Sequence, residues 1–212
     1  MNKELLKKDL FGEIWKLGGR GEFEVLRDTR PARWWLVWLA RSLLRREARA
    51  LAALAGVDGV PQLASTNHYS LTRSFLPGVP LYEDRPDRAQ YFSDAARLLR
   101  RIHRAGVAHN DLAKEPNLLV CVDGSPAFID FQLASHSRSR GRLFRIAARE
   151  DIRHLLKHKR TYRPDLLTSR ERSILDSPTI LSRAFMSLIK PVYLFVTRRL
   201  MGWSDREGAA ER

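Results

Sequence analysis

The sequence predicts an α+β fold in which a small, strand-rich N-terminal part precedes a larger, mainly helical part. Three observations predict it: alternating segments around a glycine-rich turn within residues 11–29, a helical period over residues 40–55, and a strand hairpin near residues 118–129. At 212 residues the chain can build one core or two small lobes that share a cleft, so we expect a single folding unit.

The composition favours anionic partners and a reducing compartment. The chain carries 38 Lys and Arg against 24 Asp and Glu, a net charge of +14, which attracts phosphate-rich molecules and anionic membrane surfaces. Its single cysteine, Cys121, cannot form an internal disulfide and is expected in the core. The first twenty residues lack the apolar stretch of a signal peptide, so the cytoplasm is the expected location.

Residues 11–29 are expected to form two strands joined by a tight turn, because only glycine takes positive φ freely. The glycines of this turn are Gly18, Gly19 and Gly21. In the second strand Arg27 alternates with Phe23 and Val25 and so shares a face with them. A guanidinium there either reaches water at the strand end or points into a cleft toward an anion.

The helix at 40–55 carries a carboxylate on its apolar face. Its stripe of leucines and alanines, at spacings of three and four, also contains Glu47. Burying a carboxylate is costly unless a cation pairs with it, and Arg27 on the preceding strand is the candidate partner. The alternative is a pair between Glu47 and an arginine one helical turn away.

A further strand at 69–76 is ended by Pro77, where a hinge between lobes fits. We therefore expect an N-terminal lobe of residues 1–76, a C-terminal lobe of residues 77–203 and a flexible tail of residues 204–212.

The C-terminal lobe begins with a strongly periodic helix at 87–105, which Gly106 caps. Strands at 118–122 and 127–129 follow as a hairpin. Beyond the hairpin the chain is basic, and a further helix is predicted at 149–157.

Two segments, residues 30–46 and 180–203, mix aromatic residues with arginines. Neither contains a run of about 18 uncharged apolar residues, so no membrane-spanning helix is expected. They either lie at a membrane surface or pack as ordinary amphipathic helices on the body of the protein, the second one interrupted by Pro191.

Three polar side chains lie at the outer ends of the predicted hairpin. Asp111 and Asn117 precede its first strand, and Asp130 follows its second. Because a hairpin brings its outer ends together, we expect these side chains to converge. Carboxylate and amide oxygens are the ligands that Mg²⁺ prefers, so the sequence predicts a magnesium site here.

The residues around this hairpin carry a family resemblance. The segments HNDLAKEPN at 109–117 and IDFQ at 129–132 resemble the catalytic loop H-R-D-L-x-x-x-N and the metal motif D-F-G of the protein-kinase-like fold. With FLPGVPL at 75–81, the chain looks most similar to small bacterial RIO-type kinases and lipopolysaccharide (Kdo) kinases. This resemblance implies two lobes, with a reduced N-terminal β lobe and a mainly helical C-terminal lobe.

The resemblance implies roles for the polar residues. Asp111 would orient the acceptor hydroxyl and accept its proton, and Lys114 would neutralise charge on the transferring phosphoryl group. Asp130 would hold the magnesium that bridges the phosphates of ATP, and Asn117 a second metal position. Separately, Asp151 is expected either to tie the later helix to the catalytic loop or to be an ordinary acid near a helix N-terminus.

The resemblance also implies a nucleotide site in the N-terminal lobe. Arg27 and Glu47 would replace the lysine–glutamate pair that positions the α- and β-phosphates, with Lys16 as the alternative source of positive charge. The backbone at Ser74 and Leu76 would contact the adenine. The glycines expected over the phosphates are Gly18, Gly19 and Gly21.

The predicted function is ATP-dependent transfer of a phosphoryl group to a hydroxyl of a lipopolysaccharide-type sugar or of a protein serine or threonine. The basic residues 137–142 favour an anionic acceptor at the inner membrane face, and a nucleic-acid partner rests on net charge alone. The family pattern is broken in three places: Arg27 replaces lysine, Gln132 replaces glycine, and Asn117 comes one residue late. The first two departures, Arg27 and Gln132, support the alternative of a nucleotide-binding pseudokinase that acts as a regulatory or scaffold module.

Overall fold

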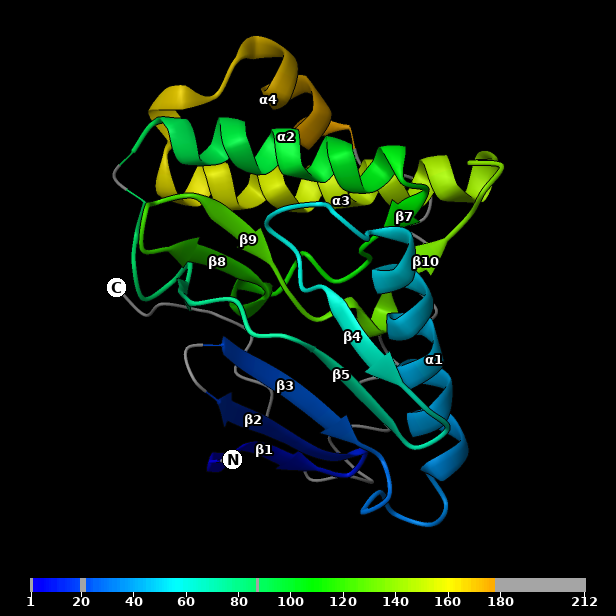
Figure 1. Ribbon diagram of the computed structural model, residues 1–212. Coiled ribbons are helices and arrows are strands. Elements are labelled where there is room, and N and C mark those ends of the chain that lie inside the picture. Colours follow the sequence, from blue (N-terminus) through cyan, green and yellow to red (C-terminus); the bar gives the residue numbers. More distant parts are fainter. Residues whose placement is uncertain (1, 20–21, 87, 178–212) are drawn as a thin grey trace.

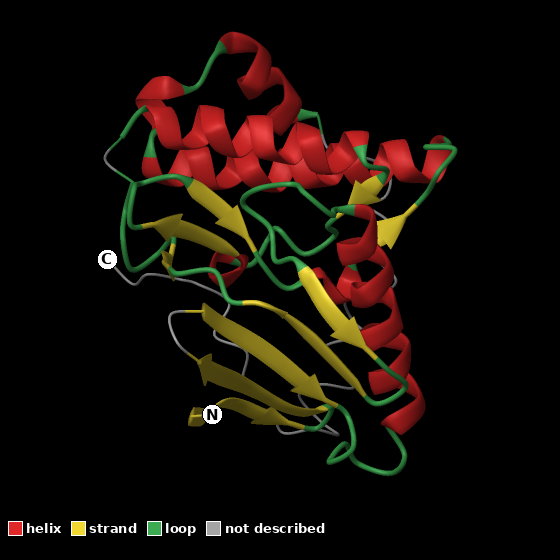
Figure 2. Cartoon of the chain, in the orientation of Figure 1, coloured by secondary structure: helices red, strands yellow, loops and turns green. Residues whose placement is uncertain are grey.

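The chain has the predicted mixed α+β structure in a computed structural model, which describes residues 2–19, 22–86 and 88–177. Figure 1 shows an antiparallel sheet with one long helix beside it at one end of the molecule and a layer of helices at the other. In Figure 2 a small sheet lies between these two ends. The expected tail at 204–212 and the segment 180–203, with Pro191, lie outside the described residues.

The N-terminal sheet has five antiparallel strands in the spatial order β1-β2-β3-β5-β4. Its strands are β1 Asn2–Asp9, β2 Gly12–Gly19, β3 Glu22–Asp28, β4 Leu63–Thr66 and β5 Ser70–Ser74. The prediction found β2, β3 and β5. It missed the two edge strands, because β1 is mostly charged and polar, and β4 is short with only one partly buried residue.

Helix α1, Val37–Ala53, confirms the predicted helix at 40–55. Its buried side chains include Leu44, Glu47 and Leu51. The segment 30–46 is thus helical only from Val37 onward. Its tryptophans stay outside the core, with exposed fractions of 87% for Trp34, 44% for Trp35 and 69% for Trp38.

A three-stranded sheet follows the end of β5. Strand β6, Gly78–Pro80, pairs with β8, Leu118–Cys121, which pairs in turn with β9, Pro126–Phe128. The predicted hairpin is therefore confirmed, but the residues after Pro77 form a strand of this second sheet. Cys121 is only half-buried, so its expected place in the core was wrong.

One long helix packs on β9 of this sheet, and a second long helix packs against the first. Helix α2, Gln90–Arg104, confirms the predicted helix at 87–105, and Gly106 follows it with a φ of +78°. A side chain at Gly106 would bring its Cβ to 2.6 Å from the carbonyl oxygen of Ser137, so the position requires glycine. Helix α3, Arg142–Tyr162, extends the predicted 149–157 helix at both ends.

The remaining elements are short. Strands β7, Val107–Ala108, and β10, Ser135–His136, form a two-stranded ladder, and helix α4, Ser169–Asp176, begins with a capping box at Thr168. The main core joins the apolar face of α2 to both sheets and to α1. Its largest fully buried side chains include Tyr91, Phe128 and Phe131.

Two histidines on α3, the half-buried His154 and the buried His158, make stability depend on pH. Burial lowers the pKa of His154 to about 4, and it also lowers the pKa of His158. Below pH 6.5 the unfolded chain takes up protons that the folded chain does not bind, so stability is lost as the pH falls toward 4.

We expect His154→Leu to remove much of this pH dependence, because leucine cannot take up a proton. For His154 alone the loss between pH 7.5 and pH 5 is about 2 kcal/mol, because only about 1.5 pH units of the shift lie above pH 5 and each is worth 1.36 kcal/mol. Urea unfolding at pH 7.5 and pH 5 measures it, with the exposed His136→Leu as control. An equal pH dependence in both variants would contradict the assignment.

Candidate functional site

The hairpin of β8 and β9 brings the predicted site residues to one place. The side-chain amide of Asn117 donates to the backbone oxygen of Asp111 at 2.8 Å and to its carboxylate at 3.1 Å. A 3-10 turn at Glu115–Asn117 accommodates the extra residue between the two positions. The late asparagine therefore still reaches Asp111.

Asp130 follows β9 in an unusual conformation. Its φ of 64° and ψ of 67° place it in the left-handed region, where few residues other than glycine occur. Its carboxylate oxygen Oδ1 is buried and has no hydrogen-bond partner among the described residues. Leaving such an oxygen unsatisfied is costly, and a bound cation would satisfy it.

The negative charge of Asp130 acts on the carboxyl group of Asp111. Burial raises the pKa of Asp111, and the charge of Asp130 raises it further, while the ammonium of Lys114, 3.2 Å from the Asp111 carboxylate, opposes the shift. Like charges held this close disfavour each other unless a cation lies between them. The part of the chain described here contains no cluster of three or more His, Cys, Asp or Glu residues that could hold a metal.

This donor set fits magnesium. Mg²⁺ commonly takes one or two protein carboxylates and completes its coordination with water and phosphate oxygens. Asp130, with its unsatisfied oxygen, is the first candidate ligand, and Asp111 and Asn117 are the neighbouring oxygen donors.

Helix α3 holds the loop at 109–117 in place through hydrogen bonds. Asp151, fully buried, accepts the backbone N–H of His109 at 2.7 Å and of Asn110 at 2.8 Å. Its Oδ2 atom also lies 3.1 Å from Nε2 of His103 on α2. The predicted tie between the later helix and this loop is confirmed.

Two further residues of α3 extend the same support. His158 Nε2 lies 2.8 Å from the backbone oxygen of Leu112, and the hydroxyl of Tyr162 donates to Glu115 at 2.8 Å. The helix therefore contacts the loop at three successive places along its length. The contacts of His158 and Tyr162 were missed because the predicted helix ended at residue 157, before both residues.

The histidine of the loop, His109, has a structural role. The ring of His109 packs on Phe131, with 4.5 Å between ring centroids, and its Nε2 lies 2.9 Å from the backbone oxygen of Ile129. The side-chain amide of Asn110 donates to the backbone oxygen of Leu133 at 2.9 Å. Both contacts fix the loop against the segment that carries Asp130.

Glu47 has two cationic partners. Nη1 of Arg27 lies 3.4 Å from one carboxylate oxygen, which confirms the predicted pair, and Nε of Arg73 lies 3.2 Å from the other. The glutamate is only 2% exposed. Arg73 was missed, although its alternation with buried Leu71 in β5 places it on the inner face of the sheet.

Lys16 lies on the same face of the sheet. It pairs with Val25 in the register of β2 and β3, and Val25 pairs with Arg73 in β5. Its ammonium lies 4.5 Å from the ring centroid of Phe23 and 4.3 Å from that of Phe75. Both cations considered for the phosphates, Arg27 and Lys16, are therefore present on this face.

The expected glycine turn is partly wrong. Gly18 and Gly19 belong to β2 and pair with β3, because the strands extend to the last residues before the turn. Gly21 lies outside the described residues. At the end of β5 the backbone N–H of Ser74 is bonded to Gln62 at 2.9 Å, so this group is not available to an adenine.

Helix α1 is also connected to the site. The guanidinium of Arg46 donates to the backbone oxygens of Leu133 at 2.9 Å and Ala134 at 3.4 Å. Both acceptors lie just beyond Asp130. The N-terminal helix and the segment that carries this aspartate are thus hydrogen-bonded to each other.

Comparison with protein-family models and with curated proteins found no match to this chain. Among the described residues, no helix is long and apolar enough to cross a membrane. The function is therefore inferred from the side chains themselves.

The support from Asp151 predicts a large effect of a small substitution. We expect Asp151→Asn to lower the free energy of unfolding by about 2–4 kcal/mol. The amide has one oxygen in place of two, so it cannot accept both backbone N–H groups and also contact His103 with a negative charge. Urea unfolding measures it. Asp165→Asn, at an exposed acid paired with Arg163, is the control and should leave the unfolding midpoint unchanged. Equal effects of the two substitutions would argue against the support.

Proposed function

We propose that this protein is an ATP-dependent phosphotransferase of the protein-kinase-like class. The observation that carries the proposal is the proximity of Asp111 and Asp130 at the ends of one hairpin, where a buried carboxylate oxygen of Asp130 has no hydrogen-bond partner in the described part of the chain. The motif resemblance of residues 109–117 and 129–132 supports the same assignment.

In this proposal the chain has two lobes. The five-stranded sheet and α1 form the nucleotide lobe of residues 1–76, and the hairpin with α2 and α3 forms the catalytic lobe of residues 77–203. The strand order supports this division, because β6 pairs with the hairpin and not with the N-terminal sheet. Residues 75–77 then connect the lobes.

The proposed chemistry assigns one task to each residue. Asp111 orients the acceptor hydroxyl and accepts its proton, for which its partly exposed carboxylate is positioned by Asn117. Lys114 stabilises negative charge on the transferring phosphoryl group. Asp130 and Asn117 hold the magnesium, which neutralises charge on the phosphates when it is bound.

The nucleotide phosphates are proposed to bind at the inner face of the sheet. Arg27 and Arg73 both contact Glu47, so this face carries one more positive than negative charge from these three residues, and Lys16 adds to it. The backbone of Leu76 remains the proposed contact for the adenine, while Ser74 is withdrawn from that role because its N–H is already bonded.

The acceptor is proposed to be a lipopolysaccharide-type sugar, with a protein hydroxyl as the second choice. Exposed tryptophans and arginines lie together before and in the first turn of α1, an arrangement that suits the interface of an anionic membrane. They are Arg30, Arg33, Trp34, Trp35 and Trp38. Peripheral attachment there would bring the enzyme to a lipid-linked acceptor.

A pseudokinase is the competing proposal. It is favoured by the occupation of the Glu47 site by arginines, which clamp phosphate differently from a lysine. A pseudokinase should be stabilised by ATP without turnover, whereas an active enzyme shows both effects.

We expect Asp111→Ala to lower phosphoryl transfer by about 10²–10⁴-fold, because it removes the general base. Transfer of labelled γ-phosphate from ATP to water, lipopolysaccharide and dephosphorylated protein measures it, and ATP-induced thermal stabilisation reports binding. Asp123→Ala, in the exposed turn at the other end of the hairpin, is the control and should keep full activity. Turnover that survives Asp111→Ala would end the proposal, and stabilisation without turnover in the parent protein would favour the pseudokinase.

We also expect Trp34→Ser/Trp38→Ser to weaken binding to vesicles that contain anionic lipid, because it removes two exposed rings. Co-sedimentation measures the bound fraction, with neutral vesicles and with Tyr82→Ser/Val122→Ser as controls for loss of exposed apolar surface elsewhere. Unchanged sedimentation of the tryptophan variant would leave the protein acceptor as the better choice.

A further inference from the structure

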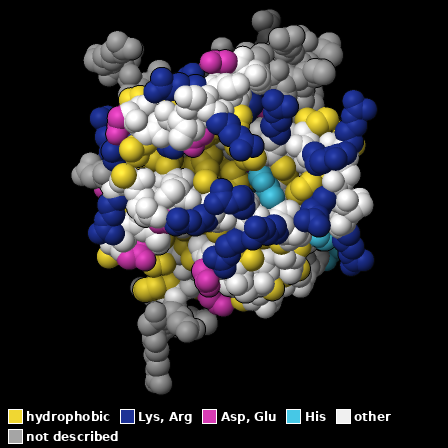
Figure 3. Space-filling model, turned by 90° about the horizontal axis from the view of Figure 1, so that it is seen from above, with side chains coloured by type: hydrophobic (Ala, Val, Ile, Leu, Met, Phe, Trp, Pro, Cys, Tyr) yellow, Lys and Arg dark blue, Asp and Glu magenta, His cyan; other side chains and the backbone are white. Residues whose placement is uncertain are grey.

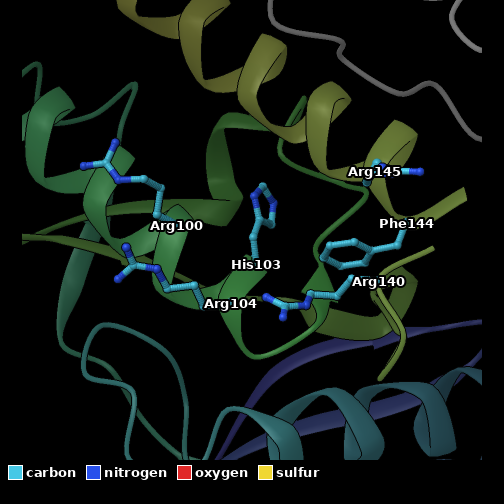
Figure 4. A pocket seen from close by; sticks show the side chains of 6 residues that line it. All are labelled: Arg100, His103, Arg104, Arg140, Phe144 and Arg145. Carbon is cyan, nitrogen blue, oxygen red and sulfur yellow. The ribbon is translucent and has the colours of Figure 1, made fainter. Parts of the chain in front are cut away.

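The helical end of the molecule carries a hollow of about 390 Å³ that the proposed phosphotransfer chemistry does not use. It lies between the end of α2, the loop after β10 and the start of α3. The residues that line it are Arg100, His103, Arg104, Arg140, Phe144 and Arg145. Figure 4 shows His103 in the middle, with Arg100 and Arg104 on one side and Phe144, Arg140 and Arg145 on the other.

The four arginines have no acidic partner in the part of the chain that the structure describes. Among the residues described by the structure, none of these guanidinium groups pairs with a carboxylate, whereas their neighbours on α2 do: Arg97 pairs with Asp94, and Arg101 with Asp58 at 3.3 Å. Figure 3 shows basic side chains gathered around a histidine and hydrophobic side chains on this face. Four uncompensated positive charges around one hollow attract an anion with several charges.

The floor of the hollow is aromatic. Phe144 is 8% exposed, and its ring packs edge-on against His103, with 6.1 Å between ring centroids. A rim of charged donors above an aromatic floor suits a ligand that combines phosphate groups with a less polar body. The hollow is open to solvent, and its volume leaves room for a small ligand.

We infer that this hollow is a binding site for a small phosphate-bearing anion with at least two negative charges. The inference stands on the hollow and its arginines and does not depend on the proposed phosphotransferase activity.

The site is placed to influence the loop at 109–117. His103 lines the hollow and at the same time contacts Asp151, whose carboxylate accepts the backbone N–H groups of His109 and Asn110. An anion in the hollow would therefore contact the same histidine that helps to hold the loop. His103 thus links the hollow to the carboxylate that holds the loop.

The test is calorimetric titration with inorganic pyrophosphate and with a hexose bisphosphate, in the absence of magnesium. We expect Arg100→Gln/Arg104→Gln to weaken binding by about tenfold or more, as loss of charge-assisted hydrogen bonds does. Arg97→Gln/Arg101→Gln is the matched control, because it removes the same charge from the same helix at the same spacing, outside the hollow. It should change the affinity by less than about twofold, because neither guanidinium lines the hollow, each is already paired with a carboxylate, and exposed charges are screened by salt.

A second measurement tests the location. The imidazole proton signals of His103 should shift on titration with pyrophosphate, in a spectrum assigned with His103→Gln, and they should not shift in the Arg100→Gln/Arg104→Gln variant. Equal weakening by the two double variants, or binding that leaves His103 unmoved, would overturn the inference. Tight binding of RNA or of anionic vesicles, with none of either small anion, would overturn it as well and would assign the basic face to a larger partner.

Discussion

One buried carboxylate determines the shape of the proposed site. Asp151 lies in the middle of α3 with no exposed surface, and it accepts the backbone N–H groups of two consecutive loop residues. A backbone that must aim both N–H groups at one carboxylate has few conformations, and Asn110 adopts the left-handed one. Asp111 follows directly, so the direction in which it leaves the loop depends on this contact.

A second buried charge links the N-terminal sheet to its helix. Glu47 would be too costly to bury alone, and two arginines from different strands compensate it. Because Arg27 and Arg73 come from neighbouring strands, the helix is held against the sheet in one position along its axis. The same network leaves excess positive charge on the inner face of the sheet, where the phosphates are proposed to bind.

The sequence was a good guide where burial imposes a period and a poor one elsewhere. Helices α1 and α2 and the hairpin were predicted because their apolar residues recur regularly. Strand β1 was missed since its residues are mostly charged, and β6 since a strand of three residues, Gly78–Pro80, is too short to show a period.

At the site, the convergence of Asp111, Asn117 and Asp130 could be predicted from the sequence, because these residues stand at the outer ends of one predicted hairpin. Arg73 and the contacts of His158 and Tyr162 depend on how distant elements pack, which no local pattern encodes.

At Asp130, whose backbone is left-handed, the stability of the fold and the proposed metal binding favour different residues. Glycine would adopt this conformation without strain and would remove a buried oxygen that has no partner among the described residues. A selection for thermal stability alone would therefore tend to replace this aspartate, while a selection for the proposed phosphoryl transfer would retain it. With aspartate at this position the fold is less stable than it would be with glycine.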